Sequence, residues 1–137
     1  MVIYFGADHR GFELKNKLRT YATSIGYEVA DLGAATLVPD DDYTDYARAV
    51  AKKISLDSVS SRGILICGSG VGMTIAANRF PNVRANLALS PDQVYASRHD
   101  DDANILVIAA VFTVENAAAG MVKVFLTTPF GADTRYR

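Results

Sequence analysis

A single cysteine followed by alternating glycines is the part of this chain best suited to chemistry. Gly63–Ile66 is an apolar run, Cys67 ends it, and Gly68, Gly70 and Gly72 follow at every second position. A glycine turn between a strand and a helix gathers backbone N–H groups around one point, which forms an anion site from main chain alone. A thiol at the lip of such a site can act as a base or a nucleophile. The amides and the helix start favour the thiolate, so we expect a lowered pKa for Cys67.

The same residues allow two simpler interpretations. A dinucleotide fingerprint needs Gly-x-Gly-x-x-Gly, but Gly72 comes one residue early, and Met73 and Thr74 replace the Gly-Lys-Ser/Thr ending of a phosphate loop. Nucleotide binding is therefore weakly supported. A free cysteine is usually a buried structural residue. The position of Cys67 at the end of a strand, facing glycine amides, favours a functional role.

A second polar group follows the first apolar run of the chain. Asp8 and His9 come directly after the predicted strand Val2–Gly6. An acid beside an imidazole suits hydroxyl recognition and proton transfer. Asp8 could instead cap the next helix, and His9 could lie on the surface. Tyr43 follows a run of aspartates and could either pack on the core or cover the site.

A run of carboxylates, Asp100–Asp102, follows His99. Adjacent carboxylates can suggest a divalent cation, but consecutive residues do not converge on one ion, and the spacing of a calcium loop is absent. Solvated charge at a helix end is the simpler interpretation, and we expect no metal site. The helix dipole would favour the cationic form of His99.

Composition narrows the class of protein. The chain has 137 residues, half of them hydrophobic and 21% charged, with a net charge of −1. This profile is typical of a globular protein and gives no sign of nucleic-acid or membrane binding. One cysteine cannot form an internal disulfide, and zinc-ligand spacing is absent. The apolar start Met1–Phe5 lacks a basic region, so it is predicted to be a strand and not a signal peptide, and we expect a cytoplasmic protein.

These groups need a scaffold, and the chain alternates short apolar runs with amphipathic segments. The predicted strands are Val2–Gly6, Tyr27–Leu32, Gly63–Cys67, Val83–Leu89 and Asn104–Ala109. The predicted helices are Arg10–Ser24, Tyr43–Leu56, Val71–Arg79, Pro91 to about Asp100, and Val114–Leu126. Five strand–helix repeats predict one α/β domain over residues 1–137, a doubly wound, Rossmann-like three-layer fold with a five-stranded parallel sheet. Ligands of such sheets bind at the carboxyl ends of the strands, where the polar residues above gather.

Three segments resemble the type B ribose-5-phosphate isomerase family, which includes galactose-6-phosphate isomerase subunits. They are Gly6–Lys15, Asp42–Ala47 and Arg62–Asn78, and the similarity extends from residue 1 to about residue 126. The resemblance implies an aldose–ketose isomerase of four- to six-carbon sugar phosphates that works through a cis-enediolate without cofactor or metal. It also implies a homodimer or a dimer of dimers, with each site completed across the interface.

The resemblance assigns roles to individual residues. Cys67 is the base, Ser69 forms a hydrogen bond near the thiol, and His99 is the candidate for ring opening. The residues expected to bind the substrate are Asp8, His9, Tyr43, Gly68, Gly70, Val71, Gly72, Asp101 and Arg135.

The chain departs from the family pattern at three places. Asp100 stands at the position of the ring-opening histidine, with His99 one residue early, and a family arginine falls near Val111, which cannot bind phosphate. The usual basic tail is replaced, leaving Arg135 and Arg137 as candidate substitutes. A short or acyclic sugar phosphate, which needs no ring opening, is therefore slightly favoured over a pentose phosphate. The alternative is a sugar- or nucleotide-binding module that kept the fold and lost turnover.

Overall fold

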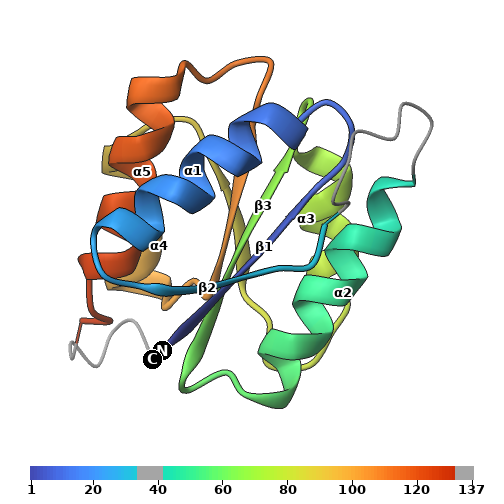
Figure 1. Ribbon diagram of the computed structural model, residues 1–137. Helices are drawn as coiled ribbons and strands as arrows, with labels where there is room; N and C mark the ends of the chain where they lie inside the picture. Colours follow the sequence, from blue (N-terminus) through green and yellow to red (C-terminus); the bar gives the residue numbers. More distant parts are fainter. Residues whose placement is uncertain (34–41, 132–137) are drawn as a thin grey trace.

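The computed structural model describes residues 1–33 and 42–131 and contains one parallel sheet (Figure 1). The described strands are β1 Val2–Ala7, β2 Glu28–Asp31, β3 Ser61–Cys67, β4 Ala85–Ala88 and β5 Ile105–Ala109. The described helices are α1 Phe12–Ser24, α2 Tyr43–Leu56, α3 Val71–Ala77, α4 Pro91–Asp101 and α5 Glu115–Thr127. The sheet has the order β2-β1-β3-β5-β4, and every neighbouring pair is parallel. None of the described helices is both long and apolar enough to cross a membrane.

Helices cover the sheet on both faces, which confirms the predicted three-layer α/β fold. Helices α1, α4 and α5 lie on one face, and α2 and α3 lie on the other (Figure 1). Successive residues of a strand point to opposite faces. Accordingly, Ile64 and Ile66 of β3 pack with the first group of helices, whereas Leu65 and Cys67 pack with the second. The alternation therefore places Cys67 on the α2/α3 side.

The predicted boundaries of several elements are confirmed by the structure. Helix α2 has the predicted bounds, Gly26 has a φ of 97° just after α1, and Pro91 occupies the first turn of α4. Helix α1 starts two residues later than predicted because the chain first makes a turn at Asp8. Strand β4 is shorter than predicted, since the Arg84 amide donates to the Asn104 side chain, 2.7 Å away, and stays outside the ladder.

One glycine sets the distance between α2 and the sheet. A methyl group added at Gly63, in the middle of β3, would lie 2.6 Å from Cγ1 of Val50 on α2. Only glycine lets the helix approach the strand this closely.

The order of the strands defines where a ligand should bind. From β1 the chain continues to β2 on one side of the sheet, and from β3 it continues to β4 on the other side, beyond β5. Such a switch point opens a crevice at the carboxyl ends of the two strands. Ala7 pairs with Ile66 there, so Asp8 and Cys67 are brought together at what we call the carboxyl edge of the sheet.

Candidate active site

A cavity of about 270 Å³ lies at the switch point, and we call it the Cys67 cavity. Its lining residues are Asp8, Arg10, Tyr43, Cys67, Gly68, Ser69 and Gly72. They come from the turn after β1, the start of α2 and the turn after β3. Three segments that are distant in the sequence therefore meet around one thiol.

Cys67 is nearly enclosed, with 6% of its surface exposed. Its Sγ accepts a hydrogen bond from the Gly70 amide at 3.0 Å. Gly70 has a φ of 81°, the left-handed conformation that turns the chain from β3 into α3 and that glycine adopts without strain. The glycine turn thus directs a main-chain donor at the sulfur, as the sequence predicted.

The predicted lowering of the Cys67 pKa is wrong. Burial raises the pKa of the thiol because the thiolate loses its hydration, and this effect exceeds that of the Gly70 hydrogen bond. The Asp8 carboxylate raises the pKa further, while the Met73 amide and Arg10 act in the opposite direction. The net effect of these groups is a pKa above the ordinary value of a thiol.

Asp8 does not cap α1, whose N-cap is Gly11, but it forms the turn before this helix and lines the Cys67 cavity, and its functional role stays a prediction. It is 7% exposed, and its Oδ1 accepts hydrogen bonds from the amides of Arg10 and Gly11 at 2.9 and 3.1 Å. These bonds form the turn that leads into α1, and the same side chain lines the Cys67 cavity. His9 is partly buried beside it but does not line that cavity.

Tyr43 forms a wall between two cavities. It is the first residue of α2, and Asp42 caps this helix by accepting a hydrogen bond from the Thr44 amide. The ring lies against Gly72, where an added methyl group would be 2.7 Å from the ring carbons. A second cavity of about 250 Å³ lies beside it and includes Arg48 and Arg79 in its lining. Tyr43 therefore lines the Cys67 cavity, and its role as a cover of the site stays a prediction.

Two residues of the glycine turn have fewer contacts than expected. Ser69 is exposed and lines the Cys67 cavity, but within the described chain its hydroxyl has no hydrogen bond, and the Gly70 amide is the donor to Sγ. Val71 is 51% exposed and lies outside the cavity lining. Their roles stay predictions.

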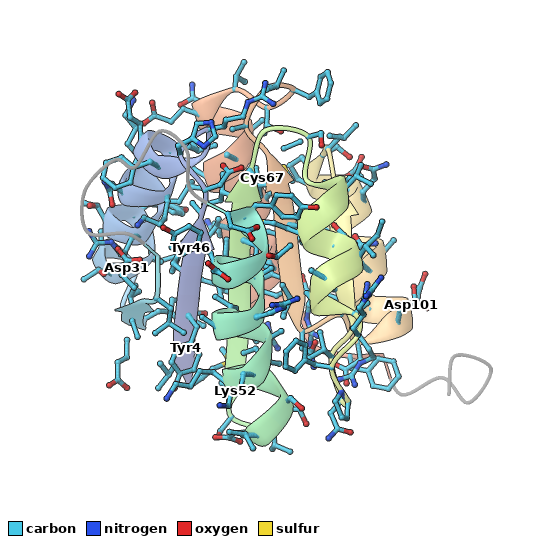
Figure 2. The ribbon with its side chains drawn as sticks, turned by 90° about the vertical axis from the view of Figure 1, so that its right-hand side faces the viewer. Tyr4, Asp31, Tyr46, Lys52, Cys67 and Asp101 are labelled. Carbon is cyan, nitrogen blue, oxygen red and sulfur yellow. The ribbon has the colours of Figure 1, made fainter. Side chains whose placement is uncertain are left out.

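His99 and Asp101 lie away from the thiol within one chain. They occupy the end of α4, next to the segment where Asn104 pairs with Arg84 ahead of β5 and β4. This is the amino edge of the sheet, opposite the carboxyl edge, and Figure 2 shows Asp101 far below Cys67. His99 stacks on Tyr95 and contacts Asp100 at 2.8 Å. A part in catalysis would require a second copy of the chain, and Arg135 lies outside the described residues.

Arg10 is the lining residue that sequence reasoning missed. Its place in the segment Gly6–Lys15 suggested only a helix start, and no spacing pattern predicts where a long side chain will lie. The only available signal was its position two residues after Asp8. Among the described residues, no group of three or more metal-binding side chains is present.

The sequence matches the Ribose/Galactose Isomerase family over residues 3–137. It is 38% identical over 128 residues to a probable ribose-5-phosphate isomerase B of Mycoplasma pneumoniae, covering 93% of this chain and 84% of that one. It is 40% identical over 108 residues to ribose-5-phosphate isomerase B of Escherichia coli, covering 79% and 71%.

Solved structures agree with the sequence matches. The crystal structure of ribose-5-phosphate isomerase B from Mycoplasma genitalium with bound ribulose 5-phosphate superposes with a TM-score of 0.95 at 34% identity, covering 98% of this chain and 88% of that one. The Thermotoga maritima ribose 5-phosphate isomerase gives a TM-score of 0.91 at 41% identity, with 97% and 90% covered. The chain therefore belongs to the ribose/galactose isomerase family and is an isomerase of the aldose–ketose class.

Proposed function

We propose that this protein interconverts an aldose phosphate and a ketose phosphate, of the ribose 5-phosphate type or a related four- to six-carbon sugar. The reaction runs through a cis-enediolate with Cys67 as the base and needs no cofactor. The observation that carries this proposal is the thiol itself, enclosed at the switch point and hydrogen-bonded to the Gly70 amide at 3.0 Å.

Cys67 would act as thiolate. It takes the proton from C2 of the open-chain aldose and returns it to C1, while the hydroxyl proton of O2 moves to O1. Negative charge builds up on the carbonyl oxygen as the C2–H bond breaks, so donors at that oxygen lower the barrier. We expect amides of the turn from Gly68 to Gly72 to serve as these donors, which is supported by the Gly70 amide lying within hydrogen-bonding distance of Sγ.

The remaining polar groups would hold the sugar. Asp8 and Tyr43 line the Cys67 cavity from two sides and suit hydroxyl groups, and His9 follows Asp8 directly. A carboxylate whose Oδ1 already accepts two amide hydrogen bonds is held in one orientation. It can therefore select the position of a hydroxyl on the bound sugar.

The proposed assembly is a homodimer in which a second copy adds to the site. Four apolar side chains that are at least half exposed follow the strands at the carboxyl edge: Val71, Leu89, Val111 and Phe112. Exposed apolar groups favour association. A partner would also offer a way for His99 to reach the substrate, and sedimentation at micromolar concentration tests the assembly. The cytoplasm stays the predicted compartment.

Solvent-deuterium exchange tests the chemistry. A panel of four-, five- and six-carbon aldose and ketose phosphates is incubated with the protein in D₂O, and exchange at C1 and C2 is followed by NMR. Exchange with isomerisation on at least one sugar supports the proposal and identifies the substrate by its rate. Binding without exchange on any member would contradict it and would favour a binding module.

A further inference from the structure

Arg10 is the one cationic side chain that lines the Cys67 cavity in the described part of the chain. Its guanidinium lies over the glycine turn, since a methyl group added at Gly68 would be 2.6 Å from Nη1 and 2.7 Å from Cζ. Gly68 directly follows the catalytic thiol. A group bound beside the turn would therefore be within reach of both the thiol and the guanidinium.

The charge of Arg10 is available to a ligand. No carboxylate within the described residues forms an ion pair with its guanidinium, although Lys15, five residues along, is held by Asp31 at 3.0 Å. Asp8 is the carboxylate of the same cavity, but its Oδ1 accepts from the backbone amides of Arg10 and Gly11. Arg10 is exposed, so solvent and ligand can reach it.

The described segment after β5, which lies next to the glycine turn, places no cationic side chain there. The segment after β5 borders the turn, because the Val111 amide donates to the Gly68 carbonyl at 3.1 Å. Its side chains there are Val111 and Phe112, both apolar and exposed. Among the described lining residues, an anionic substrate in the Cys67 cavity would thus meet the carboxylate of Asp8 and one cation, Arg10.

We propose that Arg10 binds the phosphate group of the substrate and makes the enzyme select phosphorylated over unphosphorylated sugars. The inference rests on the proposed isomerase function. A guanidinium presents five N–H donors in a planar fork, and two of them can bind a phosphate together. Such charge-assisted hydrogen bonds are stronger than neutral ones, so a large part of substrate affinity depends on this side chain.

The test compares Arg10→Gln with the wild type on ribose 5-phosphate and on unphosphorylated ribose, or on the matching pair for whichever sugar is turned over. We expect kcat/KM for the phosphorylated sugar to fall by about 10- to 100-fold, mainly through KM. Activity on the unphosphorylated sugar, measured by deuterium exchange, should change by less than about threefold, as expected for a residue that touches only phosphate. Arg10→Lys keeps the charge without the fork and should recover part of the loss.

A matched control removes a positive charge from α1, the helix that follows Arg10. Lys17 is exposed and pairs with Glu115 at 3.1 Å, so Lys17→Gln should leave kcat/KM unchanged for both sugars. Arg48→Gln tests the neighbouring cavity. A phosphate-selective loss in Arg48→Gln instead of Arg10→Gln would overturn the inference, as would an equal loss on both sugars in Arg10→Gln.

Binding of inorganic phosphate separates this inference from the proposed reaction. Calorimetric titration of wild type and Arg10→Gln with phosphate needs no turnover, and we expect affinity to fall by about 10-fold or more in the variant. If the wild type isomerises no sugar, but it binds phosphate and Arg10→Gln does not, the proposed reaction is wrong and the anion site is supported. If isomerisation is found and phosphate binds both proteins equally, the reaction stands and Arg10 has no such role.

Discussion

Both edges of the sheet carry charged groups, but the groups at the two edges differ in how far they are paired within the protein. At the amino edge, Arg62, Arg84 and Arg98 surround Asp102, and every guanidinium donates to protein oxygens. Burial and the nearby Arg98 lower the pKa of Arg62 to about 10, which still leaves it charged at neutral pH. At the carboxyl edge, Arg10 has no ion pair in the described chain, and the amides of Gly70 and Met73 only partly offset the effect of burial on the pKa of Cys67.

The difference shows how a site can be told from a structural cluster. Buried polar groups normally find partners within the protein, and those at the amino edge do. Groups that keep unused hydrogen-bonding capacity inside a cavity cost stability unless a ligand uses them. The number of charged groups therefore does not identify the site. What identifies it is whether each charged group already has a hydrogen-bond or ion-pair partner within the protein.

Cys67→Ala should have the largest effect on activity, because it removes the reactive group of the carboxyl edge. We expect kcat/KM to fall by about 1000-fold, the usual contribution of a general base. Cys67→Ser should retain a trace, because a hydroxyl is a much weaker base. Thermal unfolding should show that both variants stay folded, and near wild-type turnover in Cys67→Ala would return the thiol to a structural role.

Arg98→Met makes the opposite test at the amino edge. Arg98 is 3% exposed and donates to the carbonyls of Thr128 and Ala103 and to the Asp102 carboxylate, so its loss leaves buried acceptors without donors. We expect the free energy of unfolding in urea to fall by about 3 kcal/mol. Turnover per folded molecule should stay close to wild type. If Arg98→Met has normal stability and low activity, the amino edge contributes to catalysis and is not only a structural cluster.

The pH dependence of wild-type kcat/KM sharpens the picture of the thiol. A raised pKa keeps Cys67 neutral near pH 7, so a thiolate base predicts a rate that rises by close to tenfold per unit above about pH 7. The contribution of Cys67 to the free energy of unfolding changes in the opposite direction and falls as pH rises. Burial of the neutral thiol contributes fully below the pKa of the unfolded thiol, and this contribution is lost as pH rises through the higher folded pKa. In Cys67→Ala, this loss of stability at high pH should be absent. A wild-type kcat/KM that does not change with pH would argue against a thiolate base.

Gly72→Ala and Gly120→Ala form a matched pair with the smallest expected effects. A methyl group at Gly72 must displace the Tyr43 ring, so we expect KM to rise about fivefold as the cavity wall shifts. At Gly120, inside α5, the nearest atom would be Cγ of Pro91 at 3.6 Å, an ordinary contact. That change should stabilise the helix by about 0.5–1 kcal/mol and leave kinetics unaltered. Equal kinetic effects would show that Tyr43 does not shape the site.

Local signals in the sequence were enough to predict most of the fold. The bounds of α2, the proline at the start of α4 and the glycine after α1 follow from periodicity and from backbone preferences of single residues. The position of β5 between β3 and β4 could not be predicted, because strand order depends on how helices pack in three dimensions.

Prediction of the site was limited in the same way. The glycine turn and the contact of Gly70 with Cys67 followed from a local motif. The pKa direction of Cys67 and the placement of Arg10 over Gly68 depend on long-range packing, which buries the sulfur and orients the guanidinium. The locations of His99 and Asp101 at the opposite edge likewise follow from the path of α4.

The enclosure of the only cysteine also affects how the protein meets oxidants. Peroxides and alkylating reagents attack thiolates, and a buried thiol with a raised pKa offers few of them. The resting protein should therefore tolerate air and mild oxidation for long periods, although its proposed chemistry depends on sulfur. Because the chain has one cysteine, each alkylated thiol corresponds to one Cys67 and therefore to one proposed active site. The rate of alkylation then measures how often the crevice opens to solvent.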